Sequence, residues 1–425
     1  MIISLPEDVN SLFTRLLHSK IKSIALVFMA SAIITSTFLL VLPSNILVNE
    51  SSDYTSFYKP VALSLLNDHG LVDARGRVAL RYPPGYPIIL AGLFGFSETL
   101  HLSEKTILTL FAIFCMGMAT VFIFLISKTF WGPTSALISA AGFATYPFAL
   151  WLTKQPNVEL PFFLFFFGGL WVFVLAIFNK PHPRVFSFIS GVLLGGSMLI
   201  RPIAIGLPLV LICIIMSYGH KMRRGQSLVI AGFMLLGVIV LVLPWELWVY
   251  FKNGKVILLS SGGVPSILDG LTFGVFNRGY RQGVIISEDI QAVMRHFMAQ
   301  REQLGSIGSI VIALLEEIKE QPLAVTKLFV WKALRSWYGT DSQKLEYMIM
   351  LAQGPYMIAF LWTTIKCLNR GGNLKLVAIA IWLIVMYFWM MSVVALPLLR
   401  YMVPTIGLLF VLFPVAWENK LNYNR

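Results

Sequence analysis

Long apolar runs recur through the sequence, and they restrict the chain to a membrane fold. The first run, 23–43, holds about 20 mostly apolar residues, the length that an α-helix needs to cross the hydrocarbon core of a bilayer. Further runs lie at 104–127, 133–151, 157–179, 185–201, 202–218, 226–249, 346–366, 374–394 and 396–416. A soluble protein is excluded, because 57% of the residues are hydrophobic and only 12% are charged. We therefore predict an all-α polytopic membrane protein with about ten transmembrane helices, within a range of about 9 to 13.

The basic residues predict which ends of these helices face the cytoplasm. Arg15, Lys20 and Lys22 precede the first run, so we interpret it as an uncleaved signal anchor with a cytoplasmic N-terminus. Threading the remaining runs alternately brings the basic turns 179–184 and 220–224 to the same side. Both termini are then expected in the cytoplasm.

This threading divides the chain into four parts. They are a cytoplasmic N-terminus (1–22), a transmembrane core (23–249) that includes a first extracytoplasmic loop (44–103), an extracytoplasmic loop with interfacial helices (250–345), and C-terminal transmembrane helices (346–425). The apolar stretches 84–96 and 322–338 are too short to cross, so we expect them at the membrane interface. A turn–strand–turn pattern is predicted at 251–263, followed by helix through 288–319.

The net charge and the cysteines exclude several kinds of ligand and cross-link. The net charge of +13 does not indicate nucleic acid, because the basic residues are scattered between apolar runs; anionic lipid is the expected partner. Cys115, Cys213 and Cys367 lie inside or at the end of apolar runs, and they form neither a disulfide nor a metal-ligand pattern.

The first outer loop holds a polar segment, 53–87, between strongly apolar blocks. Asp53 is followed at helical spacing by an apolar stripe that would let the segment lie along a bilayer surface. The stripe consists of Tyr54, Phe57, Tyr58, Val61, Ala62 and Leu65. The segment ends at 81–87 in Arg-Tyr-Pro-Pro-Gly-Tyr-Pro, where the prolines and the glycine predict a rigid turn. A rigid turn beside a cation is suited to hold an anion.

Charged residues in apolar surroundings collect at the predicted outer face. They are Asp53, Arg81, Lys154, Glu159, Arg201 and Arg400. A charge at membrane depth costs about 2.5–3.5 kcal/mol on insertion scales, so such residues usually line a functional cavity or pair with each other. Two carboxylates among four cations indicate an anionic substrate.

Each of these residues also has a simpler interpretation. Arg201 and Lys154 are explained as well by cations at helix ends that extend to lipid headgroups. Glu159 would then only pair with Lys154, the proline turn would be architectural, and Asp53 would be a solvated loop carboxylate. Only their joint placement on one face favours a site.

At this point the sequence resembles a known family. The motifs are an acidic residue soon after the first span, the turn at 81–87, Glu159 opening a later run, Leu199-Ile200-Arg201-Pro202, Pro244-Trp245, and Arg400-Tyr401 with Pro404. In this order they resemble the GT-C glycosyltransferases of the protein O-mannosyltransferase and lipid A aminoarabinose transferase type. The chain departs from the pattern in lacking the large C-terminal soluble domain of some members. It also has a single acid, Asp53, where the mannosyltransferases carry an acidic pair.

The resemblance implies a transfer of sugar from a polyprenyl-phosphate donor, bound from the outer side, to a lipid, glycan or protein acceptor. Such a reaction needs a base for the acceptor proton and cations for the leaving phosphate. Asp53 and Glu159 are the candidate catalytic residues, with Asp53 as general base. The candidates for phosphate binding are Arg81, Lys154, Arg201 and Arg400, and those for a substrate pocket are Tyr54, Tyr58, Tyr82, Tyr86 and Tyr401.

The resemblance also implies a location in a bacterial inner (plasma) membrane, with the active site on the extracytoplasmic face. No metal site is predicted, because no His, Cys or Asp cluster has ligand spacing, although a divalent cation stays open. The alternative function is a lipid or saccharide transporter or flippase, for which buried charges and broken helices are also expected. The absence of inverted repeats and the one-sided charges favour the enzyme.

Overall fold

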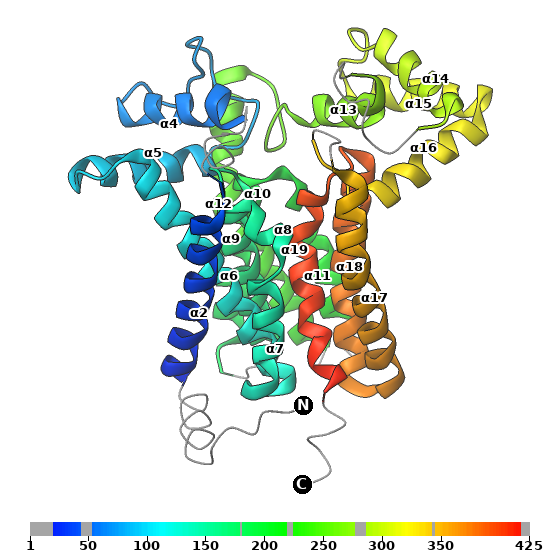
Figure 1. Cartoon of the computed structure of the whole chain (residues 1–425). Coiled ribbons are helices and arrows are strands. Elements are labelled where there is room, and N and C mark those ends of the chain that lie inside the picture. The colour runs from blue at the N-terminus through cyan, green and yellow to red at the C-terminus, as the bar shows by residue number, and fades with distance from the viewer. Residues whose placement is uncertain are drawn as a thin grey trace.

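A bundle of long apolar helices forms the body of the protein. The computed structural model describes residues 20–43, 53–178, 181–218, 224–276, 286–341 and 345–417. Within them, eight helices are long and apolar enough to cross a membrane. They are α2 (Lys20–Val41), α6 (Glu104–Trp131), α9 (Glu159–Phe178), α10 (Pro183–Ile200), α12 (Arg224–Asn253), α17 (Glu346–Arg370), α18 (Gly372–Val394), and α19 (Leu399–Leu409) with its continuation η4 (Phe410–Ala416). These helices run side by side (Figure 1), so the all-α polytopic membrane fold is confirmed.

Two predicted spans consist of shorter pieces instead. The run 133–151 is divided into α7 (Pro133–Ala144) and α8 (Pro147–Leu152), because proline disfavours helical backbone in the residue before it. The run 202–218 begins with the short 3₁₀-helix η2 (Pro202–Ala204) and continues as α11 (Leu207–Tyr218). Helices α7, α8 and α11 still belong to the bundle in Figure 1.

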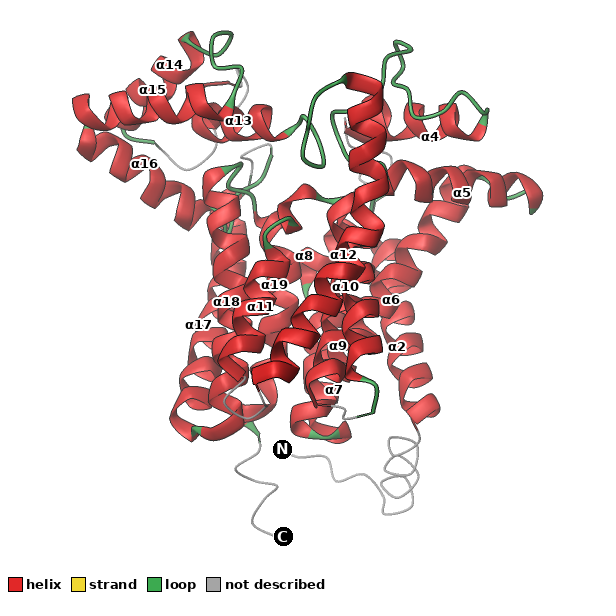
Figure 2. Cartoon of the chain, turned by 180° about the vertical axis from the view of Figure 1, so that it is seen from behind, coloured by secondary structure: helices red, strands yellow, loops and turns green. Residues whose placement is uncertain are grey.

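Two groups of shorter helices overhang one end of the bundle, on opposite sides (Figures 1 and 2). The first group consists of a short π-helix, η1 (Tyr54–Tyr58), α4 (Lys59–Leu66) and α5 (Gly85–Thr99). The second, here called the outer module, consists of α13 (Gly263–Phe276), α14 (Glu288–Ala299), α15 (Ile307–Glu320) and α16 (Pro322–Arg335). The outer module has an apolar core of its own, which includes Leu271, Val293 and Leu328.

Two local predictions need correction. The apolar stripe of η1 and α4 forms, but it does not face lipid: Tyr54, Val61 and Ala62 are buried in the main protein core, where α4 packs on α5. No strand forms at 251–263, and the described part of the chain contains only one isolated bridge, between Val72 and Val78. Instead α12 continues to Asn253, and a loop follows it.

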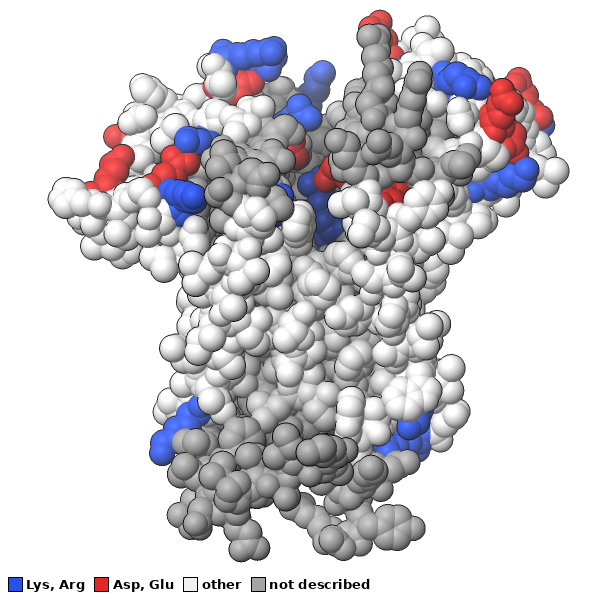
Figure 3. Space-filling view, viewed as in Figure 1, with Lys and Arg blue, Asp and Glu red and all other residues white. Residues whose placement is uncertain are grey.

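Charge is distributed as the membrane requires. On the face drawn in Figure 3, the middle of the bundle carries no charged residue, and Lys and Arg return at its lower end. At the upper end, acidic and basic residues surround the hollow between the two overhanging groups. The candidate site residues belong to this upper end.

Candidate active site

Glu159 opens helix α9 and points into protein rather than water. The side chain of Asn157 caps this end of the helix by accepting hydrogen bonds from the backbone N–H groups of Glu159 (3.1 Å) and Leu160 (3.3 Å). Partial positive charge at a helix N-terminus stabilises a carboxylate there. The Glu159 side chain is only 3% exposed, so its charge requires a partner.

Two arginines from other helix ends supply that partner. Arg201 follows the last residue of α10, and its Nη1 lies 3.3 Å from Glu159 Oε1. Arg400 lies in the first turn of α19, and its Nε is 3.8 Å from the same oxygen. Both guanidinium groups lie near the ring of Tyr401, at 4.6 Å for Arg201 and 5.3 Å for Arg400. Three helices therefore bring one carboxylate and two cations together.

The pairing of these arginines is incomplete. Arg201 Nη1 and Arg400 Nε are buried, and neither has a hydrogen-bond partner among the described residues, although both lie within ion-pair distance of Glu159. Buried N–H groups are normally hydrogen-bonded, and each exception needs an explanation. An anion with several acceptor oxygens would satisfy both groups.

Asp53 lies at the start of η1 and binds the proline-rich turn. The Tyr82 hydroxyl donates a hydrogen bond to Asp53 Oδ1 (2.9 Å), and the Arg81 guanidinium lies 5.4 Å from the centre of the Tyr82 ring. Burial raises the pKa of Tyr82, and the negative charge of Asp53 raises it further, so the phenol stays protonated and donates to the carboxylate.

Tyr58 packs beside Tyr82, and its pKa responds to charges on both the Asp53 side and the Glu159 side of the cluster. Burial raises the pKa of Tyr58 well above its ordinary value; the charges of Asp53 and Glu159 also raise it, and that of Arg201 lowers it. The rings of Tyr58 and Tyr82 lie 4.9 Å apart. One phenol is therefore within electrostatic reach of all three charges.

The glycine of the proline turn, Gly85, is required by a close approach to the end of α10. A Cβ at this position would lie 2.6 Å from the carbonyl oxygen of Leu199, two residues before Arg201. Only glycine lets the turn approach the end of α10 so closely. The turn is therefore architectural, and it joins the Tyr82 side of the cluster to the Arg201 side.

Three of the predicted residues have other surroundings. The ammonium of Lys154 lies 4.7 Å from the centre of the Trp151 ring, and the described residues show no ion pair between Lys154 and Glu159. Tyr54 is buried, and its hydroxyl donates to Glu104. Tyr86 is buried against Tyr58. Their roles in phosphate or substrate binding stay predictions.

The sequence analysis missed a third carboxylate, Asp341. Its Oδ1 lies 3.3 Å from Arg400 Nη2, and its side chain is 61% exposed. The available signal was weak: an acidic residue shortly before a membrane span, on the predicted outer side. Among the described residues, no group of three or more His, Cys, Asp or Glu could hold a metal ion, and the dependence on a divalent cation stays open.

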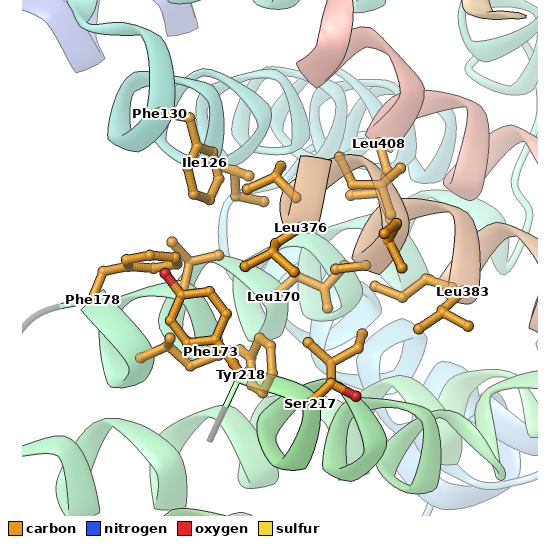
Figure 4. A pocket seen from close by; sticks show the side chains of 18 residues that line it. Ile126, Phe130, Leu170, Phe173, Phe178, Ser217, Tyr218, Leu376, Leu383 and Leu408 are labelled. Atoms are coloured by element: carbon orange, nitrogen blue, oxygen red, sulfur yellow. The ribbon is translucent and has the colours of Figure 1, made fainter. Parts of the chain in front are cut away.

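An apolar cavity of about 120 Å³ lies elsewhere in the bundle (Figure 4). Its lining includes Phe130, Phe178 and Tyr218, which lie at or near the ends of their helices opposite to Glu159 and Arg201. None of the described residues that line this cavity is charged. It does not suit a charged substrate, so the candidate site is the cluster of charges.

Comparisons with known proteins show what the chain resembles. The family model described as dolichyl-phosphate-mannose-protein mannosyltransferase matches residues 83–248, which contain the last five residues of the proline turn, Glu159 and Arg201. No curated protein matches the chain in sequence.

Solved structures resemble it over most of its length. The oligosaccharyltransferase of Archaeoglobus fulgidus matches in its apo form (TM-score 0.58, 12% identity) and as AglB in complex with an inhibitory peptide and a dolichol-phosphate (TM-score 0.55, 11% identity). Each match covers 92% of this chain but 50% of the oligosaccharyltransferase, so the chain spans half the length of that enzyme. ArnT from Cupriavidus metallidurans bound to undecaprenyl phosphate matches with a TM-score of 0.43, at 13% identity, over 92% of this chain and 78% of ArnT.

Proposed function

We propose that this chain, whose fold resembles that of the archaeal oligosaccharyltransferase, is a membrane glycosyltransferase of the GT-C type using a polyprenyl-phosphate-linked sugar donor. The observation that carries the proposal is the pair of buried guanidinium N–H groups beside Glu159, on Arg201 and Arg400, for which the described residues offer no hydrogen-bond acceptor. The presence of a dolichol-phosphate in the archaeal oligosaccharyltransferase structure supports the choice of donor class. The sugar is left unassigned.

Arg201 and Arg400 are the proposed phosphate ligands. Guanidinium groups remain charged and bind phosphate oxygens in bidentate fashion. These charge-assisted hydrogen bonds become stronger where water is excluded. Glu159 holds both arginines through one carboxylate oxygen, so its proposed role is to orient them rather than to exchange protons. Arg81 lies on the Tyr82 side of the cluster and is assigned to the same anion.

Asp53 is the proposed general base. It removes the proton of an acceptor hydroxyl while the acceptor oxygen forms a bond to the anomeric carbon of the donor. The bond from that carbon to the phosphate oxygen breaks, and the polyprenyl phosphate leaves with the electron pair. Tyr82 keeps the Asp53 carboxylate oriented through its hydrogen bond. Arg201 and Arg400 stabilise the charge that develops on the leaving phosphate.

The charged end of the bundle is assigned to the extracytoplasmic side. The support is the positive-inside bias, since Lys and Arg without Asp or Glu are seen at the opposite end of the face drawn in Figure 3. A single cysteine at the exposed position Asn67, in a variant without Cys115, Cys213 and Cys367, should react with an impermeant thiol reagent on intact cells. Labelling only after the cells are lysed would reverse the assignment.

Turnover by an Asp53→Asn variant tests the reaction. Purified protein is incubated with a panel of polyprenyl-phosphate sugars and hydroxyl acceptors, and the released polyprenyl phosphate is measured. General-base catalysis contributes about 10²–10⁴-fold, so Asp53→Asn should lower turnover by that factor with little change in donor affinity. Asp68→Asn, which removes a charge from the same loop, is the matched control, because Asp68 has a positive φ (59°) that asparagine also adopts.

Two outcomes would contradict the proposal. Wild-type turnover by a correctly folded Asp53→Asn protein on a hydroxyl acceptor would remove the base. Movement of intact donor across a vesicle membrane, without release of polyprenyl phosphate, would favour the transporter alternative instead.

A further inference from the structure

The end of helix α16 carries two buried basic residues that the proposed reaction does not use. Lys332 and Arg335 lie one helical turn apart, and their side chains are almost completely buried. Buried cations are costly unless hydrogen-bonded or paired, so their partners identify what they do.

The partners are backbone carbonyls of the turn between α18 and α19. Lys332 Nζ donates to the carbonyl of Val394 (3.2 Å), and Arg335 Nη1 donates to that of Pro397 (2.8 Å). Val394 is the last residue of α18, and α19 begins at Leu399. The outer module therefore binds, through two hydrogen bonds, the turn that precedes Arg400.

Arg335 also holds the segment that carries Asp341. Its Nη2 donates to the carbonyl of Thr340 (2.7 Å) and to Glu346 Oε1 (2.6 Å), and the same carboxylate oxygen accepts from Thr340 N–H (3.0 Å). The carbonyl of Gly339 accepts from Leu399 N–H (2.9 Å). Residues 339–341 are thus fastened to the start of α19.

Gly339 shows how closely the two segments approach. A Cβ there would lie 2.6 Å from the carbonyl oxygen of Pro397 and 2.8 Å from Arg335 Cγ. From this junction Arg400 extends to Glu159 on one side and to Asp341 on the other. The Arg335 guanidinium also lies 4.4 Å from the centre of the Phe273 ring on α13, which connects the junction to the core of the outer module.

We propose that Arg335, held by Glu346, is a positioning residue that sets Arg400 between Glu159 and Asp341, so that the outer module determines the phosphate affinity of the site. The inference rests on the proposed function in one respect, the assignment of Arg400 to the donor phosphate. Arg335 itself does not touch the substrate; it acts on affinity through the backbone of 339–341 and 397–399.

Arg335→Lys is the informative variant. Lysine keeps the positive charge, but as a point charge it cannot reproduce the planar fork that joins Pro397, Thr340 and Glu346. Binding of undecaprenyl phosphate to the purified full-length protein should weaken about tenfold, near the value for one misplaced charge-assisted hydrogen bond. Arg295→Lys, an exposed arginine of the same module, is the matched control and should leave the affinity unchanged.

A double-mutant cycle separates positioning from general loss of structure. In an Arg400→Gln background, Arg335→Lys should weaken lipid binding no further, because its effect passes through Arg400. Equal losses in both backgrounds would overturn the inference.

A second readout needs no lipid. A cysteine placed at Asp341 should react with a thiol reagent at a rate that changes several-fold in the Arg335→Lys protein. If the wild-type protein fails to bind the lipid while this rate still changes, the proposed function fails and the positioning role stands. If neither the affinity nor the labelling rate responds to Arg335→Lys, the positioning role is rejected.

Discussion

Two buried arginine–carboxylate pairs lie at the same end of the molecule and differ in how completely they are bonded. In the Arg335–Glu346 pair the nitrogen–oxygen distance is 2.6 Å, both side chains are 1% exposed, and Arg335 also donates to two backbone carbonyls. In the Arg201–Glu159 pair the distance is 3.3 Å, and Arg201 Nη1 has no hydrogen-bond acceptor among the described residues. Each arginine has one buried nitrogen without an acceptor among the described residues, Nε in Arg335 and Nη1 in Arg201, but only Arg335 is also held by several short hydrogen bonds.

This difference indicates a structural role for the Arg335–Glu346 pair and a binding role for the Arg201–Glu159 pair. A buried ion pair with several added hydrogen bonds compensates for most of the lost hydration, and removing one partner leaves an uncompensated charge. A loose pair beside the 30% exposed Arg400 has donor groups available for an incoming anion. We therefore expect loss of a charge from the first pair to lower stability strongly, besides any effect on lipid binding through Arg400, and mutation of the second pair to act mainly on binding.

The largest effect should follow from Glu346→Gln. The side chain keeps its size, but the buried Arg335 charge loses its counter-charge, which typically costs about 3–5 kcal/mol of folding free energy. Thermal unfolding of the purified protein in detergent should show this loss. Glu159→Gln is the matched comparison and should cost less, because its ion pairs are longer. A larger loss for Glu159→Gln would break the distinction between the pairs.

Arg201→Gln should act on binding more than on folding. Loss of a charge-assisted hydrogen bond to phosphate corresponds to about 1.5–3 kcal/mol, or roughly 10- to 100-fold in the affinity for undecaprenyl phosphate. The unfolding temperature should fall less than in Glu346→Gln, because Arg201 Nη1 makes no hydrogen bond in the described structure and Arg400 still faces Glu159. Arg295→Gln, in the outer module, serves as the control and should change neither quantity. Unaltered lipid affinity in Arg201→Gln would remove this arginine from the site.

Lys332, on the same helix as Arg335, is buried without a carboxylate partner among its contacts described above. Burial lowers its pKa to about 7. In the unfolded chain a lysine holds its proton up to about pH 10.4, so between these values the unfolded state binds more protons. Stability should therefore rise with pH across this window, by at most about 1.4 kcal/mol per pH unit.

The Lys332→Met variant tests this dependence. Unfolding of the wild type and the variant is followed from pH 7 to 10, and the variant should lose the slope and be more stable at the neutral end. The exposed Lys319→Met variant, on α15, should keep the wild-type slope. Parallel pH profiles for wild type and Lys332→Met would show that this amine is protonated in the folded protein across the window.

Much of the fold follows from the sequence, because a bilayer allows few solutions. Apolar runs of membrane length become helices, since a backbone in hydrocarbon must satisfy its own hydrogen bonds. Eight of the predicted runs are confirmed in this way, and the two interrupted ones contain or begin with proline. The direction of the η1–α4 stripe was not predictable, because burial against protein and burial against lipid select the same apolar residues.

The candidate site was also predicted from the sequence only in part. The sequence by itself determined which charges are costly in the membrane, and Asp53, Glu159, Arg201 and Arg400 were found for that reason. Only the tertiary structure decided the partners: Glu159 pairs with arginines from α10 and α19 rather than with nearby Lys154. Asp341 entered the cluster through the contacts of Arg335 and Gly339 with the start of α19. The physical reason is that an ion pair depends on a few ångströms of separation between groups distant in the chain, which helix packing sets and sequence spacing does not encode.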